Sequence, residues 1–259
     1  MNEITKVLLL GIIQGLTEFL PVSSSGHLVL IGKALDFSET GNMTEVILHI
    51  GTFFAVLVYF RAQLTSLVAC FFNGDRDARR YVGALALGSL PVMAVYFAAG
   101  DLIESLFDEP IWAAVFLCIT GLMLISLLLH RGAEKEITVG KGFLIGLAQA
   151  IALLPGISRS GSTIVLARHL GIKAERAAEF SFLLSLPAMA GAILIKIMCF
   201  LKGSESIVPA PALVGLLASA LVGYATLALL FSVIKRGRLW MLGVYCLAAG
   251  ILSILMLIF

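Results

Sequence analysis

Two serine-rich segments interrupt long apolar stretches of the chain, and their side chains have the chemistry to bind and attack a phosphate group. The first is Pro21-Val-Ser-Ser-Ser-Gly-His27, and the second is Pro155-Gly-Ile-Ser-Arg-Ser-Gly-Ser162. Polar, glycine-flanked backbone at membrane depth is tolerated only when protein buries it or when it lines a watery cavity. The two breaks therefore predict a site inside a membrane protein.

The second break predicts an anion site around Arg159. Pro155 and Gly156 end one half-helix, and the first amides of the next half-helix lack intrahelical partners and attract phosphate. The guanidinium fork of Arg159 can bind a phosphoryl group through paired hydrogen bonds, and an arginine near the bilayer centre is usually functional. The other predicted phosphate-binding residues here are Ser158, Ser160, Gly161, Ser162 and Thr163. In the alternative reading, the serines only cap a broken helix and Arg159 extends toward the membrane surface.

The first break supplies the complementary groups. Ser24 can be a nucleophile if a base takes its proton, and His27 is the usual kind of base. In the alternative, His27 is itself the nucleophile, or it is the base for direct attack by water, and the sequence does not separate these. Ser23 and Ser25 add hydroxyl groups for phosphate binding. Glu18, with Gln14 one helical turn earlier, could bind a metal ion, act as a general acid or base, or orient His27. The alternative is structural, with a capping histidine and a carboxylate that is hydrogen-bonded to the break.

The composition predicts that the elements carrying these breaks lie in a membrane. Of the 259 residues, 60% are hydrophobic and 13% are charged, whereas soluble chains carry about 25% charged residues. The net charge of +2 argues against a nucleic-acid partner. We expect a single all-α integral membrane domain over residues 1–259. Its six transmembrane helices are expected at roughly 45–60, 81–99, 111–130, 179–201, 211–234 and 239–259.

The two breaks split regions that are expected to enter and leave the membrane on one side. In 4–35 and 140–170 each half is too short to cross, so both are predicted to be re-entrant helix pairs. By the positive-inside rule, the Lys- and Arg-rich segments are cytoplasmic and the acidic segments external, which places both termini outside. The first group is 61–80, 131–141, 168–176 and 235–238, and the second is 36–45, 100–110 and 202–211.

The two halves of the chain, about 1–130 and 140–259, also look alike. Gln14 corresponds to Gln149 and Pro21 to Pro155, and the two hairpins are expected to open in opposite directions. This pattern predicts an inverted-topology repeat, in which broken helices of both halves meet at a site near the midplane. Gln149 is expected to hydrogen-bond backbone in the second hairpin. Chance similarity of glycine- and serine-rich apolar segments is the alternative.

The residues resemble the signature motifs of the bacterial undecaprenyl-diphosphate phosphatases, the bacitracin-resistance proteins. The segments that carry the likeness are 14–27, 155–163 and 179–187, and the order of elements agrees over the whole chain. The resemblance implies an inner-membrane enzyme that hydrolyses a polyprenyl diphosphate to the monophosphate and inorganic phosphate. This activity recycles the lipid carrier for peptidoglycan synthesis, with bacitracin resistance as a side effect.

The resemblance also implies a periplasm-facing site, stimulation by Mg²⁺ or Ca²⁺, and compatibility with a homodimer. The matching catalytic residues are Glu18, Ser24, His27 and Arg159, with Glu18 as the candidate metal ligand. Gln14 stands where many members have glutamate, and it cannot be a charged ligand. The rival class is a transporter or flippase of a lipid phosphate that uses the same midplane anion site. Only the phosphatase needs a nucleophile and a base beside that site.

Overall fold

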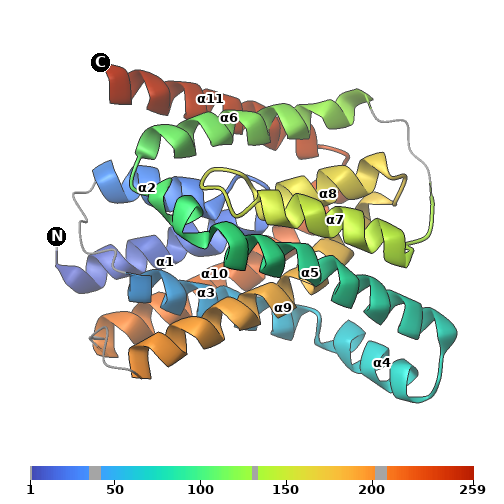
Figure 1. The fold of residues 1–259 in the computed structure, drawn as a ribbon. Coiled ribbons are helices and arrows are strands. Elements are labelled where there is room, and N and C mark those ends of the chain that lie inside the picture. Colours follow the sequence, from blue (N-terminus) through green and yellow to red (C-terminus); the bar gives the residue numbers. More distant parts are fainter. Residues whose placement is uncertain (1, 35–41, 130–133, 202–208) are drawn as a thin grey trace.

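The computed structural model describes residues 2–34, 42–129, 134–201 and 209–259, and these residues form helices without any strand. Figure 1 shows the helices running mostly side by side along one long direction of the molecule. They are α1 (Glu3–Phe19), α2 (Ser24–Ala34), α3 (Asn42–Tyr59), α4 (Arg61–Phe72), α5 (Arg76–Ser105), α6 (Pro110–Ile125), the 3₁₀ turn η1 (Ser126–Leu129), α7 (Val139–Ile151), α8 (Arg159–His169), α9 (Ala174–Leu201), α10 (Pro209–Lys235) and α11 (Leu239–Ile258).

Several of these helices are long and apolar enough to cross a membrane. Among the described residues there are five such spans, and a sixth if the bent pair α3 and α4 counts as one. The five are Arg76–Ser105, Pro110–Leu129, Ala174–Met198, Ala210–Lys235 and Leu239–Ile258, with mean hydropathies between 1.8 and 2.5. The prediction of an all-helical membrane protein is confirmed, and five of the six expected spans coincide with these helices.

The segment 61–80, predicted as a charged cytoplasmic connection, contains an additional helix. Helix α4 follows α3 after a bend of 67° and has no buried residue. Its apolar side chains Leu64, Val68 and Phe72 recur every four residues, so they lie on one face. Only Arg61 of the four arginines in this segment lies in α4, and the other three follow in α5.

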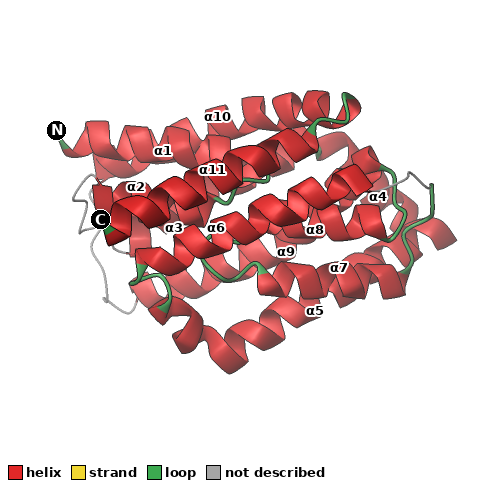
Figure 2. Cartoon of the chain, turned by 90° about the horizontal axis from the view of Figure 1, so that it is seen from above, coloured by secondary structure: helices red, strands yellow, loops and turns green. Residues whose placement is uncertain are grey.

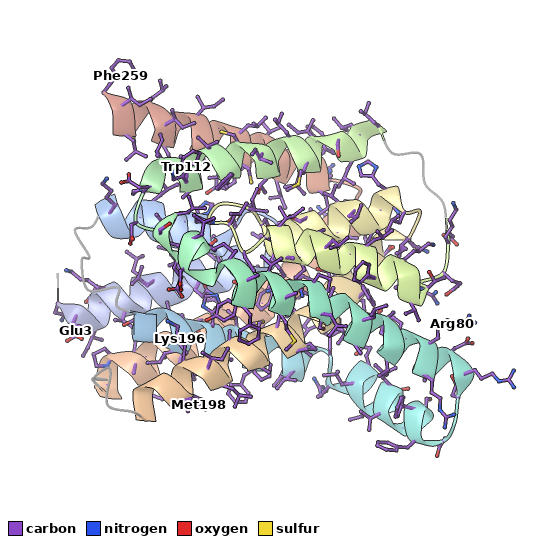
Figure 3. All side chains as sticks on the ribbon, viewed as in Figure 1. Glu3, Arg80, Trp112, Lys196, Met198 and Phe259 are labelled. Atoms are coloured by element: carbon purple, nitrogen blue, oxygen red, sulfur yellow. The ribbon has the colours of Figure 1, made fainter. Side chains whose placement is uncertain are left out.

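Both serine-rich breaks separate two helices, as expected. The first joins α1 to α2 through residues 20–23, and the second joins α7 to α8 through residues 152–158. The predicted external segments 36–45 and 202–211 lie largely outside the described residues. Both chain termini lie at one end of the molecule in Figure 1, and the labelled Arg80 lies at the other end in Figure 3.

Glycine-to-backbone contacts hold the helix that precedes each break. Helix α1 lies along α10 and α7 lies along α5, as the view in Figure 2 also shows. A Cβ atom on Gly15 would lie 2.8 Å from the amide nitrogen of Gly223, and one on Gly146 would lie 2.0 Å from the carbonyl oxygen of Gly88. Small residues allow this close approach of membrane helices. Each of these two helices therefore packs against a helix from the other half of the chain.

An aromatic cluster packs behind the end of α1. Phe19 is fully buried and meets Phe182 of α9 edge to face, with ring centroids 5.7 Å apart. Phe60, between α3 and α4, is also buried and lies 6.1 Å from the Phe182 ring. Because the residue before Phe19 is Glu18, this packing fixes the position of the carboxylate at the first break.

Candidate active site

The two breaks contact each other directly. A Cβ atom on Gly26 would lie 2.9 Å from the Cα atom of Gly156, so the backbones meet with no side chain between them. The guanidinium of Arg159, from the second break, forms a salt bridge with the carboxylate of Glu18, from the first. The groups that the sequence assigned to phosphate binding and to chemistry are thus brought together.

The first break turns through a residue in an uncommon conformation. Ser23 has φ of 67°, in the left-handed region that non-glycine residues rarely adopt. Its Oγ accepts a hydrogen bond from the amide of Gly26 at 3.3 Å and lies 3.3 Å from the Oγ of Ser25. Helix α2 begins immediately afterwards at Ser24, so the hydroxyl of Ser24 is aimed by this turn.

The second break turns through a glycine that is held by helix α6. Gly156 has φ of 95°, and a Cβ atom there would lie 2.2 Å from the carbonyl oxygen of Ala113. The hydroxyl of Thr120 donates to the Gly156 carbonyl at 2.8 Å and accepts from the amide of Ser158 at 3.0 Å. Ser158 in turn caps α8 by accepting a hydrogen bond from the amide of Gly161 at 3.0 Å.

Glu18 is the central residue of the site, and it is buried. One carboxylate oxygen, Oε1, accepts from Nη2 of Arg159. The other, Oε2, accepts from Oγ of Ser24 at 2.6 Å and from Nε2 of Gln14 at 3.1 Å. Nε2 of His49 lies 3.8 Å from the same oxygen. The predicted nucleophile and the predicted phosphate-binding arginine therefore share one carboxylate.

His27 is not placed to accept the proton of Ser24. Its Nδ1 lies 2.8 Å from the carbonyl oxygen of Ser23, and its Nε2 lies 2.7 Å from the hydroxyl of Tyr245 on α11. The predicted pairing of Ser24 with His27 is therefore wrong for this structure, because both ring nitrogens have other partners. The acceptor of the Ser24 hydroxyl is Glu18, three residues before Pro21.

A cavity of about 310 Å³ opens above these groups. It is polar where the two breaks meet and apolar along α3, α5 and α9. The residues lining it are Thr17, Glu18, Ser23, Ser24, Ser25, Val46, His49, Val92, Gln149, Ala152, Leu153, Ile157, Ser158, Arg159, Ser185, Ala188, Met189, Ala192, Ile193 and Lys196. A cavity with a polar floor and apolar walls suits a lipid that ends in a charged group.

Some buried polar atoms at this cavity lack partners. Nη1 of Arg159 and both polar atoms of the Gln149 side chain are buried without a hydrogen bond in the described part of the chain. Buried polar groups are normally paired, and an unpaired one calls for an explanation such as a ligand. The prediction that Gln149 bonds backbone is wrong, since its amide faces the cavity without a partner.

The predicted phosphate-binding hydroxyls divide into two groups. Ser23, Ser25 and Ser158 line the cavity. In α8, by contrast, Oγ of Ser162 donates to the carbonyl of Ser158 at 2.7 Å, and Oγ1 of Thr163 donates to that of Arg159 at 2.8 Å. Neither of these two lines the cavity, and Ser160 and Gly161 do not line it either. The second group stabilises the start of α8 and does not face the cavity.

The site offers few acidic side chains that could bind a divalent cation. No group of three His, Cys, Asp or Glu side chains suited to a metal occurs among the residues described. Glu18 is the one carboxylate in the cavity wall, and the buried Oε1 of Gln14 has no hydrogen-bond partner in the same part of the structure. Mg²⁺ commonly uses one or two carboxylates together with substrate phosphates and water. This donor set fits a cation that arrives with a phosphorylated substrate.

Three further residues contact the site and are not among those that the sequence assigned to it. They are Thr120, which holds the second break, His49, which lies beside Glu18, and Tyr245, which contacts His27. Only His49 carried a signal, since it lies in an apolar span near the first break. Thr120 and Tyr245 are ordinary residues of apolar helices, and only the tertiary packing reveals their contacts.

Comparison with known proteins assigns the chain to a family. Residues 7–252 match the family described as bacitracin resistance protein BacA. The chain belongs to this family. It is 40% identical to an undecaprenyl-diphosphatase of Geotalea daltonii over 99% of both chains. It is also 41% identical to one of Trichlorobacter lovleyi, over 96% of this chain and 95% of the relative. A BacA relative of Korarchaeum cryptofilum with the same name is 36% identical over 96% of this chain and 97% of its own.

Proposed function

We propose that this BacA-family protein hydrolyses undecaprenyl diphosphate to undecaprenyl phosphate and inorganic phosphate. The observation that carries the proposal is the shared carboxylate of Glu18, which binds the Ser24 hydroxyl and the Arg159 guanidinium at the floor of the cavity. The names of its full-length relatives agree with this activity. Such an enzyme returns the lipid carrier to envelope synthesis and lowers sensitivity to bacitracin.

In this proposal the cavity binds the two ends of the substrate differently. Nη1 of Arg159 and the amide of Gln149, which lack partners, donate to oxygens of the terminal phosphate. The first isoprene units lie against Val46, Val92 and Ile193, which line the apolar side. The diphosphate thus supplies the hydrogen bonds that these buried groups lack.

The chemical step follows from the Glu18 contacts. Oγ of Ser24 attacks the terminal phosphorus, its proton passes to Oε2 of Glu18, and the bond from phosphorus to the bridging oxygen breaks, which releases the lipid monophosphate. Water then attacks the phosphoserine, and inorganic phosphate leaves as Ser24 regains a proton. A loose phosphoryl-transfer transition state requires positioning and charge stabilisation more than a strong base. Arg159 supplies that stabilisation.

A divalent cation, Mg²⁺ or Ca²⁺, is part of the proposal. Glu18, the carboxylate in the cavity wall, would hold it together with substrate oxygens and water. When bound, such an ion neutralises part of the phosphate charge. Gln14 holds Glu18 through its amide nitrogen, so it supports the site whether or not the ion is present.

We further propose that the chain is an inverted repeat with two re-entrant helix pairs. An offset of 135 residues carries Ser24–Ala34 of α2 onto Arg159–His169 of α8. The helix contacts follow the same relation, since α1 with α10 corresponds to α7 with α5, and α3 with α10 corresponds to α9 with α5. The halves about 1–130 and 140–259 would be related in this way.

The same proposal has the cavity open to the periplasm and both termini external. Lys196, which lines the cavity, lies toward the end of the molecule that carries both termini, and the basic Arg80 lies at the opposite end (Figure 3). Positive charge concentrates on the cytoplasmic side of membrane proteins. A homodimer also remains a prediction, which cross-linking of the protein in native membranes would test.

Phosphate release from a long polyprenyl diphosphate tests the function. Purified wild-type protein in detergent should release phosphate, more so with Mg²⁺ or Ca²⁺, and Ser24→Ala should lose nearly all turnover. Ser105→Ala, at an exposed helix end, is the matched control with wild-type turnover. Labelled phosphate trapped on wild-type protein but not on the Ser24 variant would identify the phosphoserine. No release by folded wild type would contradict the proposal and favour a lipid-phosphate flippase.

A further inference from the structure

The imidazole of His27 connects the first break to the last helix of the chain. Nδ1 lies 2.8 Å from the carbonyl oxygen of Ser23, and Nε2 lies 2.7 Å from the hydroxyl of Tyr245. The two rings are nearly parallel, with an interplanar angle of 10°. The neighbouring Cys246 makes a weak contact of 3.8 Å to the Pro21 carbonyl. Helix α11 therefore contacts the Pro21 carbonyl directly and reaches the Ser23 carbonyl through His27.

These partners define where the proton of His27 lies. A backbone carbonyl can only accept a hydrogen bond, so Nδ1 carries the hydrogen and donates to Ser23. In a neutral imidazole the other nitrogen, Nε2, is then an acceptor, and the hydroxyl of Tyr245 donates to it. The Ser23 carbonyl thus sets the tautomer of His27. The Tyr245 hydroxyl can donate or accept, so here it donates to Nε2 and holds the ring in place.

The carbonyl that accepts the hydrogen bond from His27 belongs to Ser23, whose backbone conformation is the least favourable in the first break. Ser23 is the one described non-glycine residue with positive φ. Such a conformation persists only where surrounding contacts enforce it. The next residue is Ser24, whose hydroxyl lies 2.6 Å from Oε2 of Glu18. The orientation of the Ser23 peptide therefore sets the direction from which Ser24 reaches the cavity.

We propose that Tyr245 is a positioning residue of this enzyme and acts through His27. Its hydroxyl donates to Nε2 and holds the ring in the orientation in which Nδ1 donates to the Ser23 carbonyl, and this keeps the Ser24 hydroxyl on Glu18. His27 then acts as a clamp on the turn and does not receive the proton of Ser24. The inference rests on the proposed phosphatase function, because its kinetic readout is phosphate release.

Tyr245→Phe tests the role of the hydroxyl while keeping the ring. Loss of one hydrogen bond should lower kcat by about fivefold to tenfold, with KM nearly unchanged. Tyr224→Phe is the matched control, since Tyr224 is another half-exposed tyrosine of an apolar helix, in ring contact with Tyr59. Wild-type kcat in Tyr245→Phe, or an equal loss in Tyr224→Phe, would overturn the proposal.

Replacing His27 with asparagine or glutamine distinguishes two roles for this residue, holding the Ser23 carbonyl or accepting the proton of Ser24. The side-chain amide nitrogen of asparagine can occupy the place of Nδ1, whereas that of glutamine occupies the place of Nε2. A clamp on Ser23 predicts clearly higher turnover in His27→Asn than in His27→Gln or His27→Ala. It also predicts no further loss when Tyr245→Phe is added to His27→Asn, since the acceptor of the tyrosine hydroxyl is gone. Equal inactivity of all three histidine variants, or an undiminished effect of Tyr245→Phe, contradicts it.

Nitrogen NMR of histidine-labelled protein gives a readout that does not depend on turnover. In folded wild type, the neutral His27 ring should carry its hydrogen on Nδ1, with the resonance assigned by its absence from His27→Asn. Tyr245→Phe should shift the Nε2 resonance and leave the other histidines unchanged. A hydrogen on Nε2 in wild type would overturn the inference. Wild type that shows the expected tautomer but releases no phosphate would contradict the proposed function instead.

Discussion

The two breaks have similar local hydrogen bonds but are stabilised in different ways. In both, a serine hydroxyl accepts the amide three residues later, at Gly26 in the first and Gly161 in the second. The second turn relies on a glycine and on backbone packed against α6. The first relies on Ser23 in a left-handed conformation and on side chains that come from far along the chain.

The chemistry is divided in the same way. In the proposed mechanism, the second break carries the phosphate-binding Arg159. The proposed nucleophile Ser24 lies in the first break, and Glu18 lies just before it at the end of α1. The comparison implies that substitutions in the second break, other than at Arg159, mainly lower the stability of the protein. Substitutions in the first break are expected mainly to lower turnover.

Arg159→Ala is expected to have the largest effect. Loss of the guanidinium should lower kcat/KM by about a thousandfold, because phosphoryl transfer depends on charge stabilisation at the phosphate. Arg159→Lys should retain only part of the wild-type kcat/KM, since lysine keeps the positive charge but lacks the paired hydrogen-bond donors of the guanidinium. Steady-state phosphate release measures this, with Arg61→Ala, at an exposed arginine of α4, as the control. Wild-type turnover in folded Arg159→Ala would remove the second break from the chemistry.

Gly156→Ala is expected to have the next largest effect, a loss of stability of the folded protein. The added methyl group would meet the Ala113 carbonyl at 2.2 Å, and φ of 95° is unfavourable for alanine. We expect a loss of about 3 kcal/mol, measured as a lower Tm in detergent. Gly140→Ala is the matched control, because a Cβ atom there meets nothing within 4 Å. Equal Tm values for the two variants would show that the second break is not rigidly packed.

Thr120→Val should have a smaller effect on the same break. It leaves the Gly156 carbonyl and the Ser158 amide without their hydroxyl partner, which costs about 1–3 kcal/mol. Thr120→Ser should restore the Tm. Thr226→Val is the control, since that hydroxyl bonds only a carbonyl of its own helix. If Thr120→Val matches the control, the α6 contact contributes nothing to the turn.

Ser23→Gly should have the smallest effect on stability and is the sharpest test of the first break. Glycine removes the left-handed cost of about 1–2 kcal/mol, while the bond to the Gly26 amide is lost. Ser23→Ala also loses the hydrogen bond to the Gly26 amide, but it keeps the unfavourable left-handed backbone conformation. Its Tm should therefore be lower than that of Ser23→Gly. Turnover of Ser23→Gly should fall even though its Tm does not, since a glycine turn is freer to move. Unchanged turnover would mean that the turn does not aim Ser24.

Much of the fold was predictable from local sequence. Helix α1 ends at Phe19, two residues before Pro21, whereas α7 already ends at Ile151, four residues before Pro155. The spans α5, α6, α9, α10 and α11 follow from long apolar runs. Helix α4 was not predicted, because it is short and lies in a segment whose arginines, Arg61 at its start and three more after its end, are typical of a cytoplasmic connection. Its bend from α3 depends on the burial of Phe60, which is a property of the packed molecule.

The residues of the site were predictable by type, but not all of their pairings were. Ser24, Glu18 and Arg159 are polar groups in apolar surroundings, and such groups stand out in a sequence. Proximity along the chain suggested His27 as the partner of Ser24, whereas the helical turn directs its ring toward α11. Tyr245 lies 218 residues from His27, and no local pattern specifies a contact over that separation.

The packing of α1 against α10 has a consequence for how the chain is assembled. The glycine face of α1 meets Gly215 and Gly223, which lie about 200 residues later in the chain. At typical rates of synthesis, α1 waits roughly 10–40 s before its partner has been made. Glu18 lacks Arg159 for the first part of that time, since Arg159 follows it by 141 residues, whereas Gln14 and Ser24 are made beside it. We therefore expect the packing that holds the carboxylate to be complete only after α10 has been inserted.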